Sequence, residues 1–325
     1  RPPRSTPLYS SAASDVYKRQ LIVGSIGLDT IETPTQRQEN IIGGSTTYSL
    51  IAASRNIPVS IVGIIGNDFP DEGHSIFNSY AKNLDDLQIV QGKTFRWGGR
   101  YHKNWDDRDT LYTELGVFSD FKPVLSDSNK NRSHIFLANI HPDLQQLVIQ
   151  QNNNKEALIV IDTMNLWINE ARDSLTNVLS DSNILLLNES EARLLTKKEN
   201  LSDSASAILD MGLDTVVIKK GSNGAELFSR NEHFSVGAYP IEKVVDPTGA
   251  GDTFGGALIS ALACGKTLTD SLIYGSSLAS LCVEGFGSDK IQKVSESTVE
   301  ERVNFLQSTV KPWFNFCRDI SSNNI

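Results

Sequence analysis

Short apolar segments alternate with amphipathic segments along most of this chain. The apolar segments have the length of buried strands and cover Leu21–Ile26, Val59–Ile65, Ile135–Leu137, Leu158–Ile161, Ile184–Leu187 and Val216–Ile218. The amphipathic segments predict helices over 44–55, 142–151, 170–180, 190–196, 202–211, 251–264 and 268–284. This alternation predicts an α/β fold with three layers, in which helices flank both faces of a mostly parallel sheet. Ligands of such sheets bind at the carboxyl ends of the strands.

One segment departs from this alternation. Thr94–Leu115 is typical of two strands joined by a polar turn, and it predicts a small β-lid made of segments about 30–42 and 93–116. The alternative is a solvated surface hairpin. Because no linker or internal repeat separates a second domain, we expect a single domain over 21–310.

The two ends of the chain lack a clear pattern. The sequence begins with Arg1, and its two methionines are Met164 and Met211. Residues 1–20 are rich in proline and serine without periodicity, so we interpret them as a non-native leader or a disordered arm. We expect residues 311–325 to form a peripheral tail.

Composition limits the classes of partner. The formal net charge of -9 and pI near 5.1 argue against a nucleic acid or an anionic membrane as the partner, and no apolar run is long enough to span a bilayer. The three cysteines are far apart and match neither a metal pattern nor a disulfide framework, which favours a cytoplasmic location. We therefore expect a small-molecule ligand.

The strongest chemical motif is Asp246-Pro-Thr-Gly-Ala-Gly-Asp-Thr253, which directly precedes an apolar stripe typical of a helix. Unpaired N–H groups and the positive dipole end at a helix start bind phosphate oxygens, and Gly249, Ala250 and Gly251 would let them approach. Asp252 would accept the proton of an attacking hydroxyl. We expect it to be a weak base because it lies at a helix start. A tight turn with a capping aspartate is the alternative.

Two other motifs do not support nucleotide-binding sites. Cys264-Gly-Lys-Thr267 resembles the end of a Walker A loop, but Ser260 stands where that loop needs its first glycine. We interpret this segment as a helix end followed by the next helix start. Gly24-x-x-Gly27 lacks the three-glycine spacing of a dinucleotide fingerprint.

The octapeptide resembles the C-terminal signature of the ribokinase-like, or PfkB, family of carbohydrate and nucleoside kinases. Further motifs are similar to that family's in the same order, over about residues 21–305: Gly24–Asp29, Gly43-Gly44, Asn188-Glu-Ser-Glu191 and Lys219-Lys-Gly-Ser-Asn-Gly224. The resemblance implies an ATP-dependent phosphotransferase, in which the γ-phosphate of Mg-ATP moves to a hydroxyl of a sugar or sugar derivative.

The resemblance also implies roles for individual residues. Asp252 would be the catalytic base, and Gly249, Ala250 and Gly251 would form the anion hole. The substrate would contact Asp29 at the end of the first strand, together with Gly43, Gly44, Arg100 and Asn139. ATP would contact Asn188, Glu191, Lys219, Gly221 and Gly224. Glu191 would bind Mg²⁺ indirectly, and Asp246 is the candidate ligand of a monovalent cation such as K⁺.

Each of these motifs also has a structural interpretation. Asn188-x-x-Glu191 has the form of a helix capping box, a role that is compatible with ATP binding. Asp29 is also typical of a turn, Gly43-Gly44 of close helix packing, and Lys219 of a solvated strand edge.

The chain departs from ribokinase at positions that contact sugar. Tyr48 stands where ribokinase has an asparagine, and Gly27 stands where it has a polar side chain, so we expect a different substrate. Lid residues are candidates for recognising an acidic or phosphorylated sugar, or a nucleoside stacked on Trp97: Arg96, Trp97, Arg100, Tyr101 and Arg108. A nucleoside kinase and a non-catalytic metabolite sensor of the same fold are the alternatives. A homodimer through the lid is expected by analogy.

Overall fold

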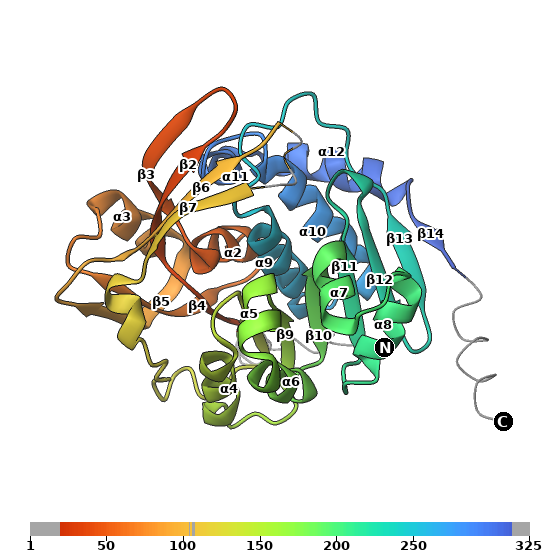
Figure 1. Ribbon diagram of the computed structural model, residues 1–325, viewed down its shortest axis with the longest axis horizontal. Coiled ribbons are helices and arrows are strands. Elements are labelled where there is room, and N and C mark those ends of the chain that lie inside the picture. The colour runs from red at the N-terminus through yellow and green to blue at the C-terminus, as the bar shows by residue number, and fades with distance from the viewer. Residues whose placement is uncertain (1–19, 104, 106–107, 314–325) are drawn as a thin grey trace, which may run out of the picture.

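The computed structural model describes residues 20–103, 105 and 108–313, which form two sheets and their covering helices (Figure 1). The main sheet has ten strands in the order β14-β13-β12-β11-β10-β9-β8-β1-β4-β5. Their bounds are β1 Gln20–Val23, β4 Val59–Gly66, β5 Ala81–Val90, β8 His134–Leu137, β9 Leu158–Asp162, β10 Ile184–Asn188, β11 Thr215–Lys219, β12 Ala225–Ser229, β13 His233–Val236 and β14 Lys311–Pro312. Neighbours from β5 to β11 pair parallel, and β12, β13 and β14 extend the sheet antiparallel. The prediction of a mostly parallel sheet is confirmed.

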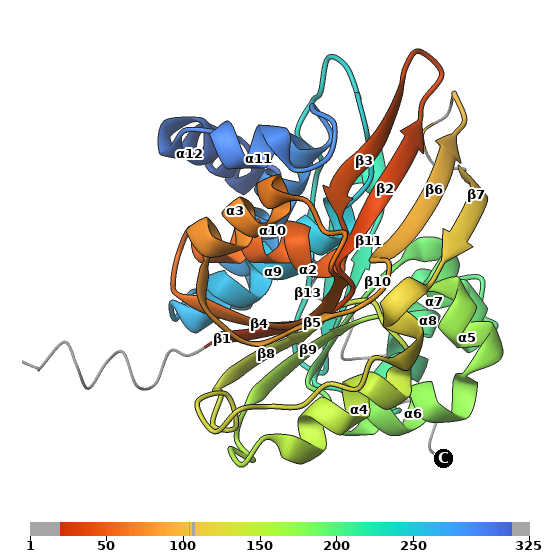
Figure 2. The ribbon, with the colours of Figure 1, turned by 90° about the vertical axis from the view of Figure 1, so that its left-hand side faces the viewer.

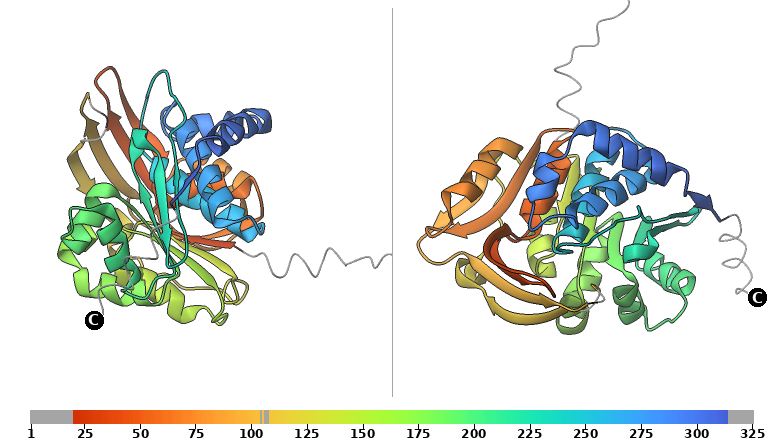
Figure 3. Two further views of the ribbon diagram at one scale, coloured as in Figure 1. Left: turned by 90° about the vertical axis from the view of Figure 1, so that its right-hand side faces the viewer. Right: turned by 90° about the horizontal axis from the view of Figure 1, so that it is seen from above.

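Helices cover both faces of the main sheet, and Figure 3 shows them on opposite sides of its strands. One face carries α2 Ser45–Ser54, α3 Asp71–Tyr80, α9 Ala250–Ala263, α10 Leu268–Cys282, α11 Asp289–Lys293 and α12 Glu296–Gln307. The other carries α4 Pro142–Gln151, α5 Asn165–Glu170, α6 Arg172–Ser180, α7 Glu189–Thr196 and α8 Leu201–Leu209. Successive side chains of a strand point to opposite faces, so each strand contributes to both cores: Val160 packs toward α9, and Ile161 toward the other layer.

The second sheet has four strands in the order β3-β2-β6-β7, and it stands away from the main sheet as a lid (Figure 2). Its strands are β2 Gly27–Glu32, β3 Arg37–Gly43, β6 Phe95–Tyr101 and β7 Arg108–Glu114. They overlap the segments expected to form the lid, although β2 begins at Gly27, before the first of these segments. The turn predicted between the two later strands falls partly on residues 104, 106 and 107, outside the described residues.

The expected first strand, Leu21–Ile26, is too long. The main-sheet strand β1 ends at Val23, and the chain then crosses to the lid strand β2. The crossing is tight, because a Cβ on Gly24 would lie 2.4 Å from the Ser45 hydroxyl, and that hydroxyl accepts a 3.0 Å hydrogen bond from the Ser25 N–H. Asp29 therefore lies within a lid strand and not at the end of the first strand.

Several other elements differ from the sequence-based expectation. The predicted helix over 170–180 is confirmed as α6, and a short helix that was not predicted, α5, precedes it; the two meet at Ala171 in a non-helical conformation. Strand β5 was not predicted, because at one edge of the sheet it needs no continuous apolar run. At the opposite edge, β14 pairs with β13, so Lys311 and Pro312 extend the main sheet; residues 314–325 of the expected tail lie outside the described part.

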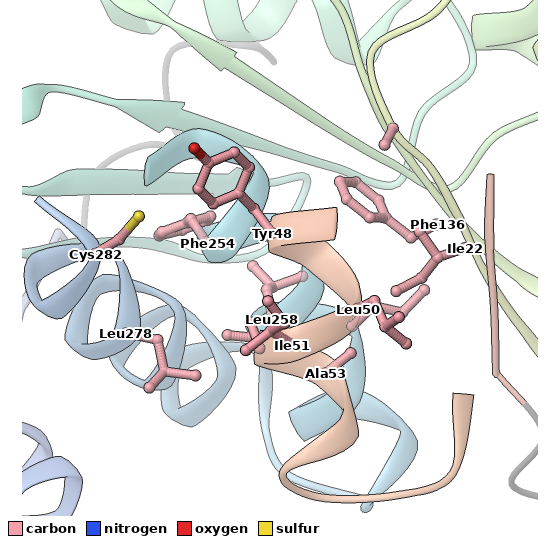
Figure 4. Close-up of a cluster of buried hydrophobic side chains, with 14 of the residues drawn as sticks. Ile22, Tyr48, Leu50, Ile51, Ala53, Phe136, Phe254, Leu258, Leu278 and Cys282 are labelled. Atoms are coloured by element: carbon pink, nitrogen blue, oxygen red, sulfur yellow. The ribbon is translucent and has the colours of Figure 1, made fainter. Parts of the chain in front are cut away.

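Helix α9 packs tightly against α2, and this contact positions the Asp246–Thr253 motif. A Cβ on Gly256 would lie 2.2 Å from the Ser49 carbonyl oxygen, so only glycine allows the two helices to approach this closely. Phe254 and Leu258 of α9 then pack with Tyr48 and Ile51 of α2 in the buried cluster of Figure 4. None of the helices within the described ranges combines the length and apolar composition that crossing a membrane requires.

Candidate active site

The Asp246–Thr253 motif forms a loop that ends at the start of α9. Gly249 is the N-cap of this helix and has φ +75°, a left-handed conformation that favours glycine. The Asp246 carboxylate fixes the loop, because it accepts hydrogen bonds from the Thr248 N–H (2.9 Å) and from the Gly287 N–H (3.1 Å). The first N–H groups of α9 lack acceptors within the helix, so the loop is suited to bind an anion. The loop also continues into the predicted helix.

The Tyr48 ring packs against this loop at Gly249. An ideal Cβ on Gly249 would lie 2.4 Å from the Tyr48 ring, and the Tyr48 side chain is only 1% exposed. Its ring points toward Phe254 and Cys282 in Figure 4. The expectation that Tyr48 contacts the substrate is therefore wrong, because the ring is enclosed in the core beneath the anion-binding loop.

Asp252 lies in the first turn of α9 and keeps part of its surface open to solvent. The surrounding protein nevertheless displaces most of its water, which, with the nearby negative charge of Asp162, raises the pKa of Asp252 to about 7. The positive charges of Lys219 and Arg108 oppose this shift. The expectation of a weak base is therefore wrong: burial outweighs the helix dipole, and the resulting pKa suits a general base.

Lys219 at the end of β11 is enclosed and ion-paired. Its Nζ lies 3.1 Å and 3.2 Å from the two carboxylate oxygens of Asp162, at the end of β9. Burial alone would lower the pKa of Lys219, but Asp162 and Glu191 raise it above its usual value, so the ammonium stays charged. The alternative interpretation of Lys219 as a solvated edge charge is wrong.

Asp29 faces the start of α2 from the lid. Its carboxylate accepts a hydrogen bond from the Gly44 N–H, and Gly44 is the N-cap of α2 with φ +88°. A Cβ on Gly43 would lie 2.0 Å from Asp29 Oδ2, so the glycine pair makes room for this carboxylate. Burial, followed by the charges of Asp246 and Asp252, raises the pKa of Asp29 to about 8.

The two motifs assigned to ATP lie at the ends of β10 and β11. Asn188 and Glu191 form the predicted capping box: Asn188 Oδ1 accepts from the Glu191 N–H (2.9 Å), and Glu191 Oε2 accepts from the Asn188 N–H (2.8 Å). Gly221 and Gly224 bound a short 3-10 turn and have φ +54° and +90°. The capping role is confirmed, whereas contact with ATP stays a prediction for all four residues.

Arg100 and Asn139 were the remaining substrate candidates. Arg100 is exposed on β6 and pairs with Glu32 of the neighbouring strand, with Nε 2.8 Å from Oε1. Asn139 follows β8 and is half-buried; its amide donates to Met164 Sδ (3.1 Å) and accepts from Trp167 Nε1 (2.9 Å). Their substrate contacts stay predictions.

The lid contacts the Asp246–Thr253 loop directly. The Thr248 hydroxyl lies 3.1 Å from the phenol oxygen of Tyr101, which is buried on β6. Arg108 pairs with Tyr101 across the lid strands, hydrogen-bonds to its phenol and has its guanidinium 5.4 Å from the centre of the Trp97 ring. The charge of Arg108 lowers the pKa of Asp29, Asp252 and Glu191. The lid therefore brings one cation to the group of acids.

The described residues contain no group of three His, Cys, Asp or Glu side chains able to hold a metal ion by themselves. Glu191 supplies a half-buried carboxylate beside the positively charged Lys219. Mg²⁺ commonly takes few protein ligands and completes its shell with phosphates and waters, so this donor set fits a magnesium ion bound mainly through a nucleotide.

The structure thus brings Asp29, Gly43, Gly44, Asp252 and Lys219 around one site. Sequence reasoning missed Asp162, although a signal was present, since an acid that follows a buried parallel strand lies at the ligand-binding edge of the sheet. The Tyr101–Thr248 contact had no comparable signal.

Comparison with known proteins gives consistent findings. The family described as pfkB family carbohydrate kinase matches residues 30–293. A cytidine kinase of Thermococcus kodakarensis is 28% identical over 78% of this chain and 92% of its own length, and a ribokinase of Haemophilus influenzae is 28% identical over 87% and 98%. The fold resembles a nucleoside kinase of Methanocaldococcus jannaschii (TM-score 0.73, 18% identity, 89% of this chain and 98% of that one). It also resembles a putative ribokinase II of E. coli in complex with ATP and Mg²⁺ (TM-score 0.74, 22% identity, 89% and 99%).

Proposed function

Because this chain belongs to the pfkB family of carbohydrate kinases and is therefore a phosphotransferase that acts on a hydroxyl group, we propose that its substrate is an uncharged sugar or sugar derivative and that Asp252 is the general base. The phosphate donor in this proposal is Mg-ATP. The observation that carries the proposal is the position of Asp252: a half-buried carboxylate with a pKa of about 7 at the start of α9, beside the anion-binding loop.

The chemistry follows from this arrangement. Asp252 takes the proton of the attacking hydroxyl, and its pKa near neutral makes it both ionised and basic enough at physiological pH. The first N–H groups of α9, from Gly249 to Gly251, stabilise the negative charge that develops on the phosphoryl group. Asp29 and the Gly43-Gly44 pair hold the acceptor's other hydroxyl groups. Mg²⁺, held through the nucleotide near Glu191, would neutralise charge on the phosphates.

The charge balance of the lid favours an uncharged acceptor. Arg96 has its Nη2 3.0 Å from Asp68, and Arg100 is paired with Glu32, so both arginines already have anionic partners. Asp29, with a pKa of about 8, is mostly protonated near neutral pH, so Arg108 and Lys219 balance Asp162, Asp252 and Glu191. An acceptor carrying a carboxylate or phosphate would add negative charge to a site that is already acidic, and like charges at short range are unfavourable. Between the alternatives left open by the sequence, this charge balance favours an uncharged acceptor over an acidic or phosphorylated sugar.

A nucleoside is the second candidate acceptor, because it is also uncharged. The Trp97 ring is half-buried on the lid with the Arg108 guanidinium 5.4 Å from its centre, and a nucleoside base would take the place of this cation on the ring face. The similarity to a cytidine kinase over 92% of that enzyme's length supports this candidate.

The experiment is an ADP-release assay on a panel of sugars, sugar acids, sugar phosphates and nucleosides, run with the wild type and Asp252→Asn. We expect ADP release with at least one uncharged acceptor and almost none in the variant, while ATP binding is nearly unchanged. Equal turnover in Asp252→Asn would contradict the base assignment. Absence of release with every acceptor would favour the non-catalytic sensor.

A second variant separates the two acceptor classes. If a nucleoside is the substrate, Trp97→Ala should raise its KM about 10-fold, the effect of losing one base–aromatic stack. An unchanged KM would show that Trp97 is not a recognition surface.

Three further parts of the proposal concern the environment of the enzyme. K⁺ would bind the Asp246 carboxylate oxygens, which also accept hydrogen bonds from the backbone N–H groups of Thr248 and Gly287. Equal turnover in KCl and NaCl would contradict activation by K⁺. A homodimer through the lid and a cytoplasmic location stay predictions. Light scattering of the purified chain measures its mass in solution and so tests the homodimer.

A further inference from the structure

Asp162 and Lys219 meet across an intervening strand. Strand β10 lies between β9 and β11, and Asp162 is in register with Leu186, which is in register with Val217. Lys219 lies two residues beyond Val217, so its side chain leaves the same face of the sheet. This is the face covered by α9, because Leu186 and Val217 pack in the same core as α9. The sheet register therefore directs both side chains toward the helix that carries Asp252.

Lys219 ends directly beside the anion-binding loop. Its Nζ is 3.2 Å from the position that a Cβ on Gly251 would occupy, so the ammonium lies against the first turn of α9. Its side chain is 19% exposed and that of Asp162 only 6%. The charge that remains accessible thus belongs to the lysine, on the side of the phosphate-binding groups.

Asp162 is itself held rigidly by the end of its strand. Its Oδ1 accepts a 2.9 Å hydrogen bond from the Thr163 N–H. The Asp162 carbonyl accepts from Nε2 of the buried Gln145, 3.0 Å away, and the same amide binds the carbonyls of Leu137 and Ala138 at the end of β8. The carboxylate is therefore fixed by groups that do not depend on a ligand.

We propose that Asp162 is a positioning residue for phosphoryl transfer, which holds the Lys219 ammonium beside Gly251 so that it contacts the phosphoryl group as it moves from ATP to the acceptor. This inference rests on the proposed function. A buried ion pair is weak evidence for a role in stability, because removing two charges from water offsets most of their attraction. A charge placed where negative charge develops has a direct catalytic use.

The same pair acts on the general base. The charged or titratable groups that face Asp252 come from five elements: Asp162 of β9, Lys219 of β11, Arg108 of β7, Asp29 of β2 and Cys282 of α10. After burial, the Asp162 carboxylate is the largest influence that raises the pKa of Asp252, and Lys219 is the largest that lowers it. The two partners of one ion pair therefore shift the base in opposite directions.

The test compares kcat, KM and pH profiles of Asp162→Asn, Lys219→Met and the double variant. The matched control is Glu226→Gln, because Glu226 also pairs with a lysine of the Lys219–Lys220 region: Lys220 Nζ lies 2.6 Å from Glu226 Oε1, with side chains 22% and 15% exposed. We expect Asp162→Asn and Lys219→Met each to lower kcat about 10²-fold with little change in the acceptor KM, the loss typical of a misplaced catalytic group. Glu226→Gln should keep the wild-type kcat.

Two readouts separate positioning from a purely structural role. The double variant should be no slower than Lys219→Met alone, because groups that act as one unit are not additive. The acidic limb of the kcat/KM profile should move to lower pH in Asp162→Asn and to higher pH in Lys219→Met. The double variant removes both charges together, so it remains informative if Asp162→Asn alone folds poorly.

Three results would overturn the inference. The first is an Asp162→Asn enzyme with wild-type kcat and an unmoved pH limb. The second is a double variant whose loss is the product of the single losses. The third is that Asp162→Asn and its control Glu226→Gln lose the same fraction of kcat and the same number of degrees in melting temperature. Each leaves the proposed function standing, whereas a wild type that transfers phosphate to no acceptor overturns the proposed function and this inference with it.

Discussion

The Thr248 hydroxyl donates a 3.1 Å hydrogen bond to the phenol oxygen of Tyr101, and this contact joins the lid to the anion-binding loop. The two residues are 147 positions apart in the sequence. Thr248 also donates its backbone N–H to Asp246, which fixes the same loop from the other side. The position of the lid and the shape of the loop are thus connected through one residue.

Tyr101→Phe should weaken lid closure. The substitution removes the hydrogen bonds of the phenol with Thr248 and Arg108, each worth about 0.5–1.5 kcal/mol, so we expect kcat/KM for the acceptor to fall roughly 5- to 100-fold. The control is Tyr112→Phe, which removes a 2.7 Å hydrogen bond to Thr30 within the lid. Steady-state kinetics should show a smaller effect in the control; equal effects would mean that only lid stability matters.

Gly249→Ala should abolish most activity. The new methyl group would lie 2.4 Å from the Tyr48 ring, so the anion-binding loop must shift, and a misplaced catalytic group costs about 10²-fold in kcat. Gly265→Ala is the matched control, because Gly265 also has a positive φ (+79°) but open space around it. It should lose only about 1 kcal/mol of stability, measured by denaturant unfolding, and keep its kcat. Similar kcat values in both variants would contradict the supporting role of Tyr48.

The pH profile of the wild type should report Asp252. Only the ionised carboxylate can accept a proton, so kcat/KM should fall as pH decreases through about 7. Asp252→Asn should lower kcat about 10²- to 10⁴-fold, the usual contribution of a general base, and remove this limb. If kcat/KM of the wild type fell only near pH 4, the pKa of the general base would not be raised by burial.

Asp29 should make the folded protein less stable at alkaline pH. Its pKa rises from an ordinary 3.8 to about 8 on folding, so between these values the folded state holds a proton that the unfolded state releases. The contribution of Asp29 to the free energy of unfolding is therefore fully present below about pH 4 and is lost as pH rises through about 8. Asp29→Asn should raise the melting temperature at pH 8, by about 2–4 °C for each kcal/mol, and much less at pH 4.

Asp68→Asn should change the melting temperature at pH 8 in the opposite direction to Asp29→Asn. Burial opposes ionisation of Asp68, but hydrogen bonds from Thr94 and the Arg96 pair lower its pKa below the ordinary value. This group contributes stability above its ordinary pKa, and the contribution is lost as pH falls, so the variant should melt at a lower temperature than the wild type at pH 8. Equal changes of melting temperature at pH 8 in Asp29→Asn and Asp68→Asn would contradict the opposite pKa shifts of the two carboxylates.

The sequence by itself determined the α/β class and the placement of the Asp246–Thr253 motif at the start of a helix. Both depend on neighbouring residues: the length of apolar runs such as Leu158–Ile161 sets the strands, and the contiguous Asp246–Thr253 motif carries its own helix start. The lid could also be located, because two strands and a turn lie within a short segment. Even the capping role of Asn188 and Glu191 was readable, since a capping box spans four residues.

Only the tertiary structure decided the chemistry at the centre of the site. Asp162 and Lys219 are 57 residues apart and meet because β10 separates their strands by one position in the sheet. Tyr48 occupies a sugar-contacting position by sequence, yet packing against Gly249 places it in the core. The pKa of Asp252 was expected to be low from its helix start and is raised by burial and by Asp162. Local sequence fixes which groups are present, whereas burial and charge depend on residues that only the fold brings together.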